Sequence, residues 1–361
     1  MPEVQLSICI PIYNFGAFIA DTLDSIREQC QATPEAVEVL VVDGASTDNT
    51  AAVVGEFAAG WTQLRYVRLP RRGGIDADLA ESVRLARGEY CWLFSGDDVM
   101  REGAVEKALQ WLRQGHDVYL CKHFNCDLSM KVLGEHPVFR SDVARTTELG
   151  DPQQRLAYMS EGVTTEAVFS FMSSLIVRRD KWLSVPDPQE FMGSCWGHVA
   201  RFFMLAQTHL RVCYVGEIWV ERRGENDSFL DRGVVNRLRI AVDGFHGIAN
   251  RFFRQVSQEA AQIRRMVRND LSLGLWLYAK YRSCKVPDIE SRRELDRLIA
   301  ICYGDPGIRC WLVRTTYRLM PARVYPILGR IYHLMPSEVT RMLRWFYRRI
   351  TKTPQAIGAR G

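Results

Sequence analysis

An apolar stretch that ends in two adjacent acids is the feature of the sequence that most suggests chemistry. Residues 90–98 read YCWLFSGDD, so five apolar or aromatic residues are followed closely by Ser95, Asp97 and Asp98. On its own this pattern fits an ordinary turn, in which Asp98 caps the next helix. It also fits a carboxylate site for a divalent metal ion, because Mg²⁺ and Mn²⁺ are held by oxygen ligands.

Three earlier apolar segments also end in polar residues or glycines. These residues are Pro11, Tyr13 and Asn14 after the first segment, Asp43 and Gly44 after the second, and Arg71, Arg72, Gly73, Gly74 and Asp76 after the third. Ligands of open parallel sheets bind at the carboxyl ends of the strands, so we expect these residues and the acids of the fourth segment to converge. Such a set suits a nucleotide diphosphate held through Mg²⁺ or Mn²⁺, which would also stabilise a departing diphosphate.

The elements that would position these residues alternate between strand and helix patterns. Strands are predicted at 6–10, 37–42, 64–69, 90–94 and 117–121, and helices over 18–29, 51–58, 75–87 and about 105–115. This alternation predicts an α/β fold with a mostly parallel sheet flanked by helices. Further on, a strand is expected near 173–177, two short strands within 212–223, and helices beyond residue 231.

Charge is distributed unevenly between the first 307 residues and the C-terminal segment. The chain has 361 residues, 47% of them hydrophobic and 25% charged, which is typical of a globular protein with one large domain and a smaller one. The net charge is +5, but residues 308–361 carry about +10, so residues 1–307 sum to about −5. We therefore divide the chain into a catalytic-type domain (1–230), a helical extension (231–307) and a basic tail (308–361).

The sequence argues against a membrane-spanning, a secreted or a zinc-binding protein. No stretch approaches 18 consecutive apolar residues, and the N-terminus lacks the basic leader and long apolar core of a signal peptide. The ten cysteines are scattered without a CxxC pair, and no His or Cys cluster with ligand spacing completes a zinc set. We therefore expect a cytosolic protein with reduced thiols and no zinc site.

Four motifs in a fixed order carry a family resemblance. PIYN, VVDGASTDNT, GGIDADLAESVRLARGEY and LFSGDD together resemble glycosyltransferase family 2, whose members have the GT-A fold. With DVYLC, FSFMSSLIVRRDKW and RGENDSF, the chain is similar to the abequosyltransferase-type enzymes of O-antigen assembly over roughly residues 5–250. The resemblance implies a metal-dependent, inverting hexosyltransferase of lipopolysaccharide biosynthesis. It implies a nucleotide-sugar donor, with a deoxy- or dideoxyhexose on CDP favoured, and a lipid-linked saccharide acceptor.

The resemblance also implies roles for the residues at the strand ends. Pro11, Tyr13 and Asp43 would hold the base and ribose of the donor. The family's Asp-x-Asp metal motif appears here as Ser95-x-Asp97, which makes Asp97 the expected metal ligand and leaves Ser95 to bind the ribose. The other predicted members of the site are Asn14, Gly74 and Asp76 for the donor, and Asp98 as a further metal-site acid or a helix cap.

Two departures from the family pattern concern the later motifs. The family's acidic pair, whose Asp is the general base, is replaced by Gly197-His198, so His198 is the candidate base. The alternative is a structural or acceptor-contacting His198, with Asp187 or Glu190 as the base. In the other motif Arg223 is expected to bind the diphosphate, and Glu225 replaces a His as either a metal ligand or a surface acid.

Residues 308–349 alternate aromatic and aliphatic residues with arginines at near-helical spacing, and prolines interrupt them. This pattern predicts short helices that lie on an anionic membrane surface; the alternative is a helical cap packed on the domain. The resemblance, with its lipid-linked acceptor, implies that this surface is the inner face of the cytoplasmic membrane. No base-reading motif supports a nucleic-acid partner. Two rival functions remain open: a non-catalytic nucleotide- or glycan-binding membrane-surface protein, and a nucleotidyltransferase.

Overall fold

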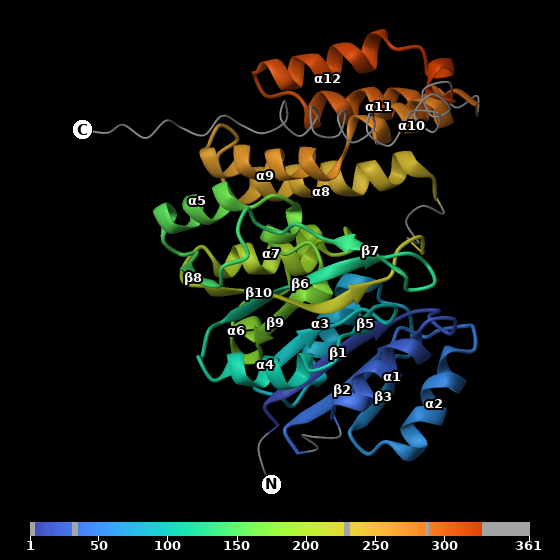
Figure 1. Cartoon of the computed structure of the whole chain (residues 1–361), viewed down its shortest axis with the longest axis vertical. Helices are drawn as coiled ribbons and strands as arrows, with labels where there is room; N and C mark the ends of the chain where they lie inside the picture. The colour runs from blue at the N-terminus through green and yellow to red at the C-terminus, as the bar shows by residue number, and fades with distance from the viewer. Residues whose placement is uncertain (1–3, 31–34, 227–231, 286–288, 327–361) are drawn as a thin grey trace. The chain divides into compact units, whose positions relative to one another are not determined.

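The computed structural model describes residues 4–30, 35–226, 232–285 and 289–326 (Figure 1). The chain divides into two compact units, one formed by residues 1–231 and 243–270 and the other by residues 232–242 and 271–361. The three-part division predicted from the sequence stays a prediction.

A ten-stranded mixed sheet lies at the centre of the first unit. Its strands follow the order β3-β2-β1-β4-β9-β6-β10-β5, with β7 beside β6 and β8 beside β10. The bounds are β1 Leu6–Ile12, β2 Val37–Asp43, β3 Leu64–Arg68, β4 Tyr90–Leu93, β5 Val99–Met100, β6 Val118–Cys126, β7 Val132–Glu135, β8 Arg145–Glu148, β9 Leu175–Arg178 and β10 Arg211–Arg222. Strands β3, β2, β1 and β4 are parallel, whereas β9 runs antiparallel to both β4 and β6. The expected α/β class with a helix-flanked sheet is confirmed.

Helices cover both faces of the parallel strands. The helices of this unit are α1 Ile19–Cys30, α2 Thr50–Gly60, α3 Ile75–Leu85, α4 Ala104–Leu112, α5 Pro152–Glu161, α6 Arg179–Leu183, α7 Gly197–Leu205 and α9 Gln258–Asp270, with the 3₁₀ turns η1 Thr165–Val168, η2 Met172–Ser174 and η3 Gln189–Phe191. On one face, β1 buries alternate residues in a core shared with α1 and α4. On the other face, the Cys9 thiol contacts the Ser82 carbonyl of α3. Both β1 and β2 are buried along their whole length, which explains why they read as continuous apolar runs.

One predicted strand pair is wrong. Residues 211–222 form the single strand β10 rather than two short strands, and its register with β6 shifts between Tyr214 and Ile218 and again before Val220. Gly216 lies at the first irregularity with φ +71°, a conformation that favours glycine. A glycine in a strand pattern marks a bulge as readily as a turn.

The second unit is helical, as the sequence predicts. It contains the first part of α8 (Val234–Phe252), α10 Leu273–Lys285, α11 Ile289–Cys302, α12 Ile308–Leu319 and the turn η5 Ala322–Val324. Trp276, Leu298 and Tyr303 are buried in it, and the Tyr317 hydroxyl donates to Asp296 at 2.9 Å. Residues 327–361, which hold most of the predicted membrane-surface helices, lie outside the described residues. Within the described part of the chain, no helix has the length and apolar character needed to cross a membrane.

Candidate nucleotide and metal site

The ends of β1, β2 and β4 meet at one edge of the sheet, as expected for parallel strands. Ile12, the last residue of β1, is the register partner of Asp43 at the end of β2. The side chain of Ile12 also lies where a Cβ on Gly96 would be, in the turn that follows β4. Asp43 and the Ser95–Asp98 segment therefore lie on the two sides of Ile12.

Asp43 is held rigidly. Its carboxylate is buried, and it accepts hydrogen bonds from the Tyr66 hydroxyl at 2.6 Å and from the Ser46 backbone N–H at 2.7 Å. Nearby, the guanidinium of Arg72 lies 3.9 Å from the centroid of the Tyr13 ring. A carboxylate with two fixed donors keeps lone pairs for a ribose hydroxyl or a base N–H.

Asp78 is an acid that the sequence analysis did not single out. Its carboxylate lies so close to Gly44 and Gly73 that a Cβ at either glycine would collide with it. One of its oxygens, Oδ1, has no hydrogen-bond partner among the described residues, and burial raises the pKa of Asp78. Asp78 therefore adds an acid to the site, beside the glycines that follow β2 and β3.

Asp97 is the acid with access to solvent. It is half-buried, with Oδ1 accepting a hydrogen bond from the Ser95 hydroxyl and Oδ2 accepting one from the Asn226 amide at 2.5 Å. The Ser95 N–H in turn donates to the Ser173 hydroxyl at 3.0 Å. Ser95 and Asp97 present oxygen atoms here, and oxygen is the ligand that Mg²⁺ and Mn²⁺ prefer.

Asp98 points into the protein. It is 2% exposed and accepts hydrogen bonds from the Ser173 hydroxyl at 2.6 Å and from the Arg223 N–H at 3.1 Å. Burial, together with the charge of Asp97, raises the pKa of Asp98 to about 7. The helix-cap reading of Asp98 is wrong, because the next helix begins at Ala104 with Gly103 as its N-cap.

Arg223 and Glu225 lie differently from what their predicted roles require. The Arg223 guanidinium donates to the backbone oxygens of Asp97 and Leu128 at 2.9 and 2.7 Å and to Asp21 at 2.7 Å, so it ties three segments together. Glu225 is exposed, and among the described residues no contact joins it to either acid of the 95–98 segment. It is the following residue, Asn226, that reaches Asp97.

Of four further predicted site residues, Asp76 and Asn14 hold loops in place. Asp76 accepts hydrogen bonds from the N–H groups of Gly193, Cys195 and Gly197 at 2.8 to 2.9 Å, so it fixes the loop before α7. The Asn14 side chain accepts from the Thr47 N–H, which joins the loops after β1 and β2. Gly74 has φ +86°, as the turn before α3 requires, and Pro11 is buried within β1.

His198 is buried at the first turn of α7. Its Nε2 lies 3.0 Å from the Phe169 carbonyl oxygen, to which it donates, and burial lowers the pKa of His198. A neutral ring in this position carries its lone pair on Nδ1. The alternative bases are engaged in ion pairs, Asp187 with Arg84 and Arg201 and Glu190 with Arg251.

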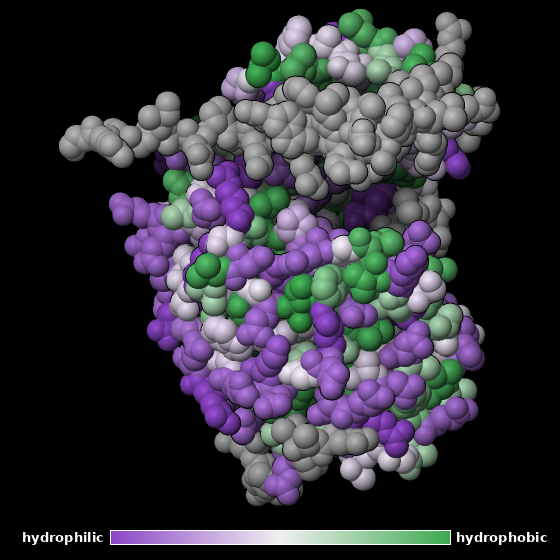
Figure 2. All heavy atoms as spheres, viewed as in Figure 1, coloured by the Kyte–Doolittle hydropathy of each residue, from purple (hydrophilic) through white to green (hydrophobic). Residues whose placement is uncertain are grey.

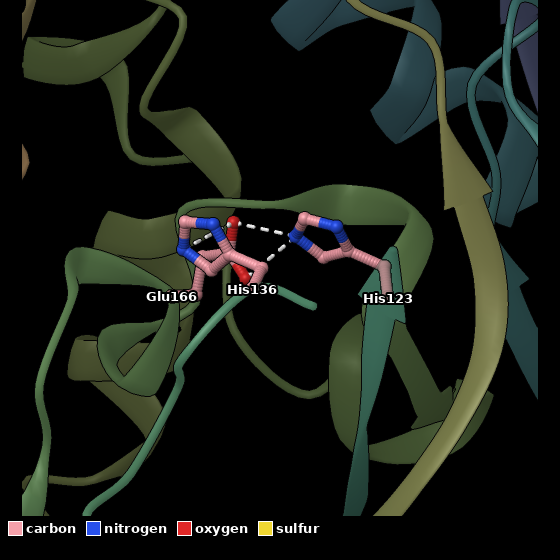
Figure 3. A group of neighbouring side chains, drawn as sticks. All are labelled: His123, His136 and Glu166. Atoms are coloured by element: carbon pink, nitrogen blue, oxygen red, sulfur yellow. Dashed lines mark hydrogen bonds and ion pairs between the residues drawn. The ribbon is translucent and has the colours of Figure 1, made fainter. Parts of the chain in front are cut away.

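The structure brings together one cluster of metal-ligand type that sequence spacing did not reveal. Figure 3 shows His123 of β6, His136 after β7 and Glu166 of η1, whose ligand atoms all lie within 4.8 Å of one another. Burial alone would raise the pKa of Glu166, but the two histidines lower it overall. The three residues are far apart in the sequence, so no local motif signals them.

None of the ten cysteines is in a disulfide, in agreement with the expected thiols.

The comparisons with known proteins agree with this geometry. Residues 7–170 match the family described as glycosyl transferase family 2. The chain is 28% identical to the abequosyltransferase RfbV of Salmonella typhimurium over 305 residues, which cover 82% of this chain and 88% of that protein.

Among solved structures, TarS 1–349 of S. aureus in complex with UDP-GlcNAc has a TM-score of 0.56 at 16% identity and covers 89% of this chain and 88% of that one. The mannosyltransferase PcManGT of Pyrobaculum calidifontis, in complex with GDP-Man and Mn²⁺, has a TM-score of 0.50 at 18% identity and covers 92% and 88%. These structural similarities support the GT-A fold.

Proposed function

We propose that this chain, whose residues 7–170 match glycosyl transferase family 2, is an inverting, metal-dependent enzyme of bacterial O-antigen assembly. It would move a sugar from a nucleotide diphosphate to a lipid-linked saccharide. The observation that carries the proposal is the placement of the fixed carboxylate of Asp43 and the accessible carboxylate of Asp97 on the two sides of Ile12. A nucleotide diphosphate needs one group for its ribose or base and another for its metal-bound phosphates.

Each part of the donor has a partner in this arrangement. Asp43, locked by Tyr66 and Ser46, would accept hydrogen bonds from the nucleoside. Asp97 would hold Mg²⁺ or Mn²⁺, and the ion supplies positive charge against the departing diphosphate. Because the Arg223 donors are used within the protein, the half-buried Arg222, whose charge acts on Asp98, is the better candidate for the phosphates.

His198 is our candidate for the general base. Its Nε2–H bond to Phe169 fixes the ring and leaves the basic lone pair on Nδ1, which would take the proton of the attacking acceptor hydroxyl. Its lowered pKa keeps the ring neutral, and therefore able to accept a proton, at neutral pH.

Calorimetric titration of the purified chain with CDP, UDP, dTDP and GDP, each with and without Mn²⁺, tests the donor site. We expect one of these nucleotides to bind about tenfold or more tightly with the ion than without it, because the ion links Asp97 to the phosphates. Absence of metal-dependent binding for all four would contradict the proposal and favour a non-catalytic binding protein. Release of pyrophosphate from a nucleoside triphosphate would favour a nucleotidyltransferase.

We further propose that the enzyme works at an anionic membrane surface, where a lipid-linked acceptor would be found. Within α12, large apolar side chains are exposed beside three arginines. The exposed fractions are 78% for Ile308, 56% for Trp311, 42% for Leu312 and 73% for Leu319, and Figure 2 shows hydrophobic residues on the surface there. Apolar and basic residues on one surface helix are typical of interfacial binding.

Replacing Trp311 with Glu is expected to weaken binding to phosphatidylglycerol vesicles about tenfold or more, since an apolar ring is lost and a repelling charge is gained. Vesicle sedimentation measures the effect. Val256→Glu is the matched control, because Val256 is 93% exposed but lies in the first unit. Equal losses in the two variants, or equal binding to neutral phosphatidylcholine vesicles, would rule out α12 as the membrane contact.

A further inference from the structure

Two histidines converge on one buried carboxylate outside the donor site. His123 Nε2 lies 2.8 and 2.9 Å from the two Glu166 oxygens, and His136 Nε2 lies 3.3 Å from Glu166 Oε1. The two imidazole rings are stacked, with centroids 4.7 Å apart and an angle of 18° between the planes. As Figure 3 shows, both rings direct a nitrogen toward the same carboxylate.

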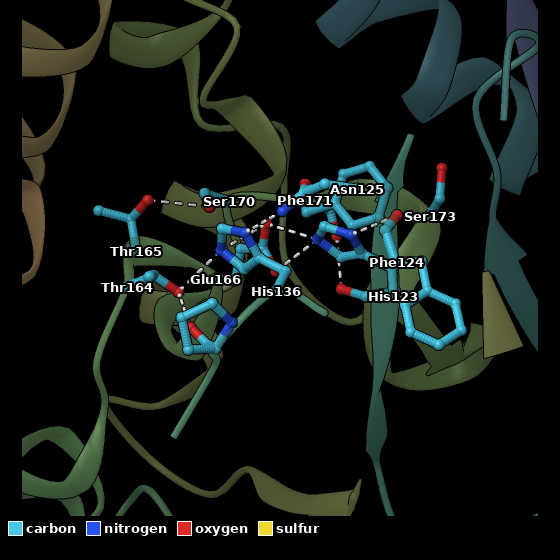
Figure 4. A network of polar contacts seen from close by, with 12 residues as sticks. His123, Phe124, Asn125, His136, Thr164, Thr165, Glu166, Ser170, Phe171 and Ser173 are labelled. Atoms are coloured by element: carbon cyan, nitrogen blue, oxygen red, sulfur yellow. Dashed lines mark hydrogen bonds and ion pairs between the residues drawn. The ribbon is translucent and has the colours of Figure 1, made fainter. Parts of the chain in front are cut away.

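The surrounding hydrogen bonds orient these nitrogens (Figure 4). His123 Nδ1 lies 3.2 Å from the Phe124 carbonyl oxygen, and His136 Nδ1 lies 3.2 Å from the Asn125 side-chain nitrogen, so in each ring the other nitrogen, Nε2, faces the carboxylate. The Thr164 hydroxyl donates to the Pro137 carbonyl at 2.9 Å, which leaves its lone pairs toward His136 Nε2 at 3.3 Å. The Glu166 carboxylate therefore needs N–H donors or a cation on this side, beyond the nearby charge of Arg222.

Either protons on the two Nε2 atoms or a metal ion can meet the carboxylate. Protons would give each ring its own hydrogen bond to Glu166, short for His123 at 2.8 Å and long for His136 at 3.3 Å. A metal ion uses all three groups, and the bond from His123 Nδ1 to a backbone carbonyl is the usual orienting contact of a metal-bound histidine. The proposal of a metal ion rests on the three ligand atoms, which lie within 4.8 Å of one another, and on the orienting contact of His123 Nδ1.

We propose that His123, His136 and Glu166 bind a divalent transition metal ion, with Zn²⁺ as the first candidate, at a site separate from Asp97. Two imidazole nitrogens and one carboxylate suit Zn²⁺ better than Mg²⁺, which prefers oxygen ligands alone. Three protein ligands leave a fourth position for water. That position lies toward His136, whose side chain is 18% exposed, compared with 0% for His123 and 6% for Glu166.

The proposed ion would join three segments that are far apart in the sequence. His123 belongs to β6, His136 follows β7, and Glu166 belongs to η1. A few residues after η1, Ser173 bonds both the Ser95 N–H and Asp98. The ion would thus fix the segment that supports the Ser95–Asp98 turn, and its role is positioning.

The test uses the full-length chain purified without a histidine tag. We expect elemental analysis to find one transition metal ion per chain. After the ion is removed with a chelator, titration with Co²⁺ should give the visible absorption of nitrogen- and oxygen-bound cobalt. His136→Gln and Glu166→Gln should lower the Co²⁺ affinity at least about 100-fold.

Two controls separate this site from others. His209→Gln should bind Co²⁺ like the wild type, because His209 pairs with Glu148 on the surface and is outside the cluster. Asp97→Asn should also retain the cobalt spectrum, whatever its effect on nucleotide binding. If Glu166→Gln does not fold, the more exposed His136→Gln decides. Metal-free wild type whose Co²⁺ titration matches that of His136→Gln would overturn the proposal and leave a proton between His123 and Glu166.

Discussion

Replacing Asp97 with Asn is expected to lower the rate of sugar transfer about 10³-fold and to abolish the Mn²⁺-dependent part of nucleotide binding. Asp97 is the accessible acid at the end of β4, since Asp98 is buried and engaged by Ser173 and Arg223. An amide keeps the shape of the side chain but supplies no negative charge to the ion. The proposed ion would be needed most when the diphosphate departs, so the loss should fall mainly on kcat.

Asp180→Asn is the control for this experiment, because Asp180 is an exposed acid that pairs with Arg178, which lies beside the start of β4 and not beside its carboxyl end. Ser95→Asp is a companion variant that restores the family's Asp-x-Asp pattern. The Ser95 hydroxyl now bonds Asp97, so a carboxylate there would add a second negative ligand and should tighten Mn²⁺ binding. Turnover that survives in Asp97→Asn would contradict the metal role of Asp97.

The fold could be predicted from the sequence where burial is complete. β1 and β2 are buried on both faces, and their apolar runs give nearly correct bounds. The antiparallel direction of β9 could not be predicted, because a four-residue apolar run carries no signal of strand direction. The length of β10 was missed for a related reason, since Gly216 resembles a turn in sequence and is a bulge in the structure.

The sequence predicted the location of the candidate site better than the orientation of its side chains. The order of strand ends was enough to bring Asp43 and Asp97 to one edge of the sheet. Where each side chain points depends on partners that are distant in sequence: Asp98 turns toward Ser173, and Arg223 is bound by Asp21. The cluster around Glu166 was missed because tertiary packing alone assembles it.

Asp76 and Asp78 also show that partners distant in sequence decide the role of a side chain. Replacing Asp76 is the second substitution for which we expect a large effect. They are two residues apart in the first turn of α3 and therefore face different neighbours. Asp76 accepts three backbone N–H groups from residues 193–197, whereas Asp78 Oδ1 has no partner among the described residues. In Asp76→Asn an NH₂ group would face at least one of these N–H groups. We expect the free energy of unfolding to fall by about 3 kcal/mol or more, as measured by urea denaturation.

Asp78→Asn is the matched control and should be neutral or stabilising at pH 7, although both acids are almost equally buried. Burial raises the folded-state pKa of Asp78, so the folded chain holds this proton more tightly than the unfolded chain. The contribution of Asp78 to stability is therefore complete below the ordinary carboxyl pKa and is lost as the pH rises through the raised value. Asp78→Asn should remove this part of the pH dependence. If the two variants were equally destabilised, the effect would come from replacing a buried carboxylate. The three N–H bonds of Asp76 to the loop that precedes His198 would then not explain it.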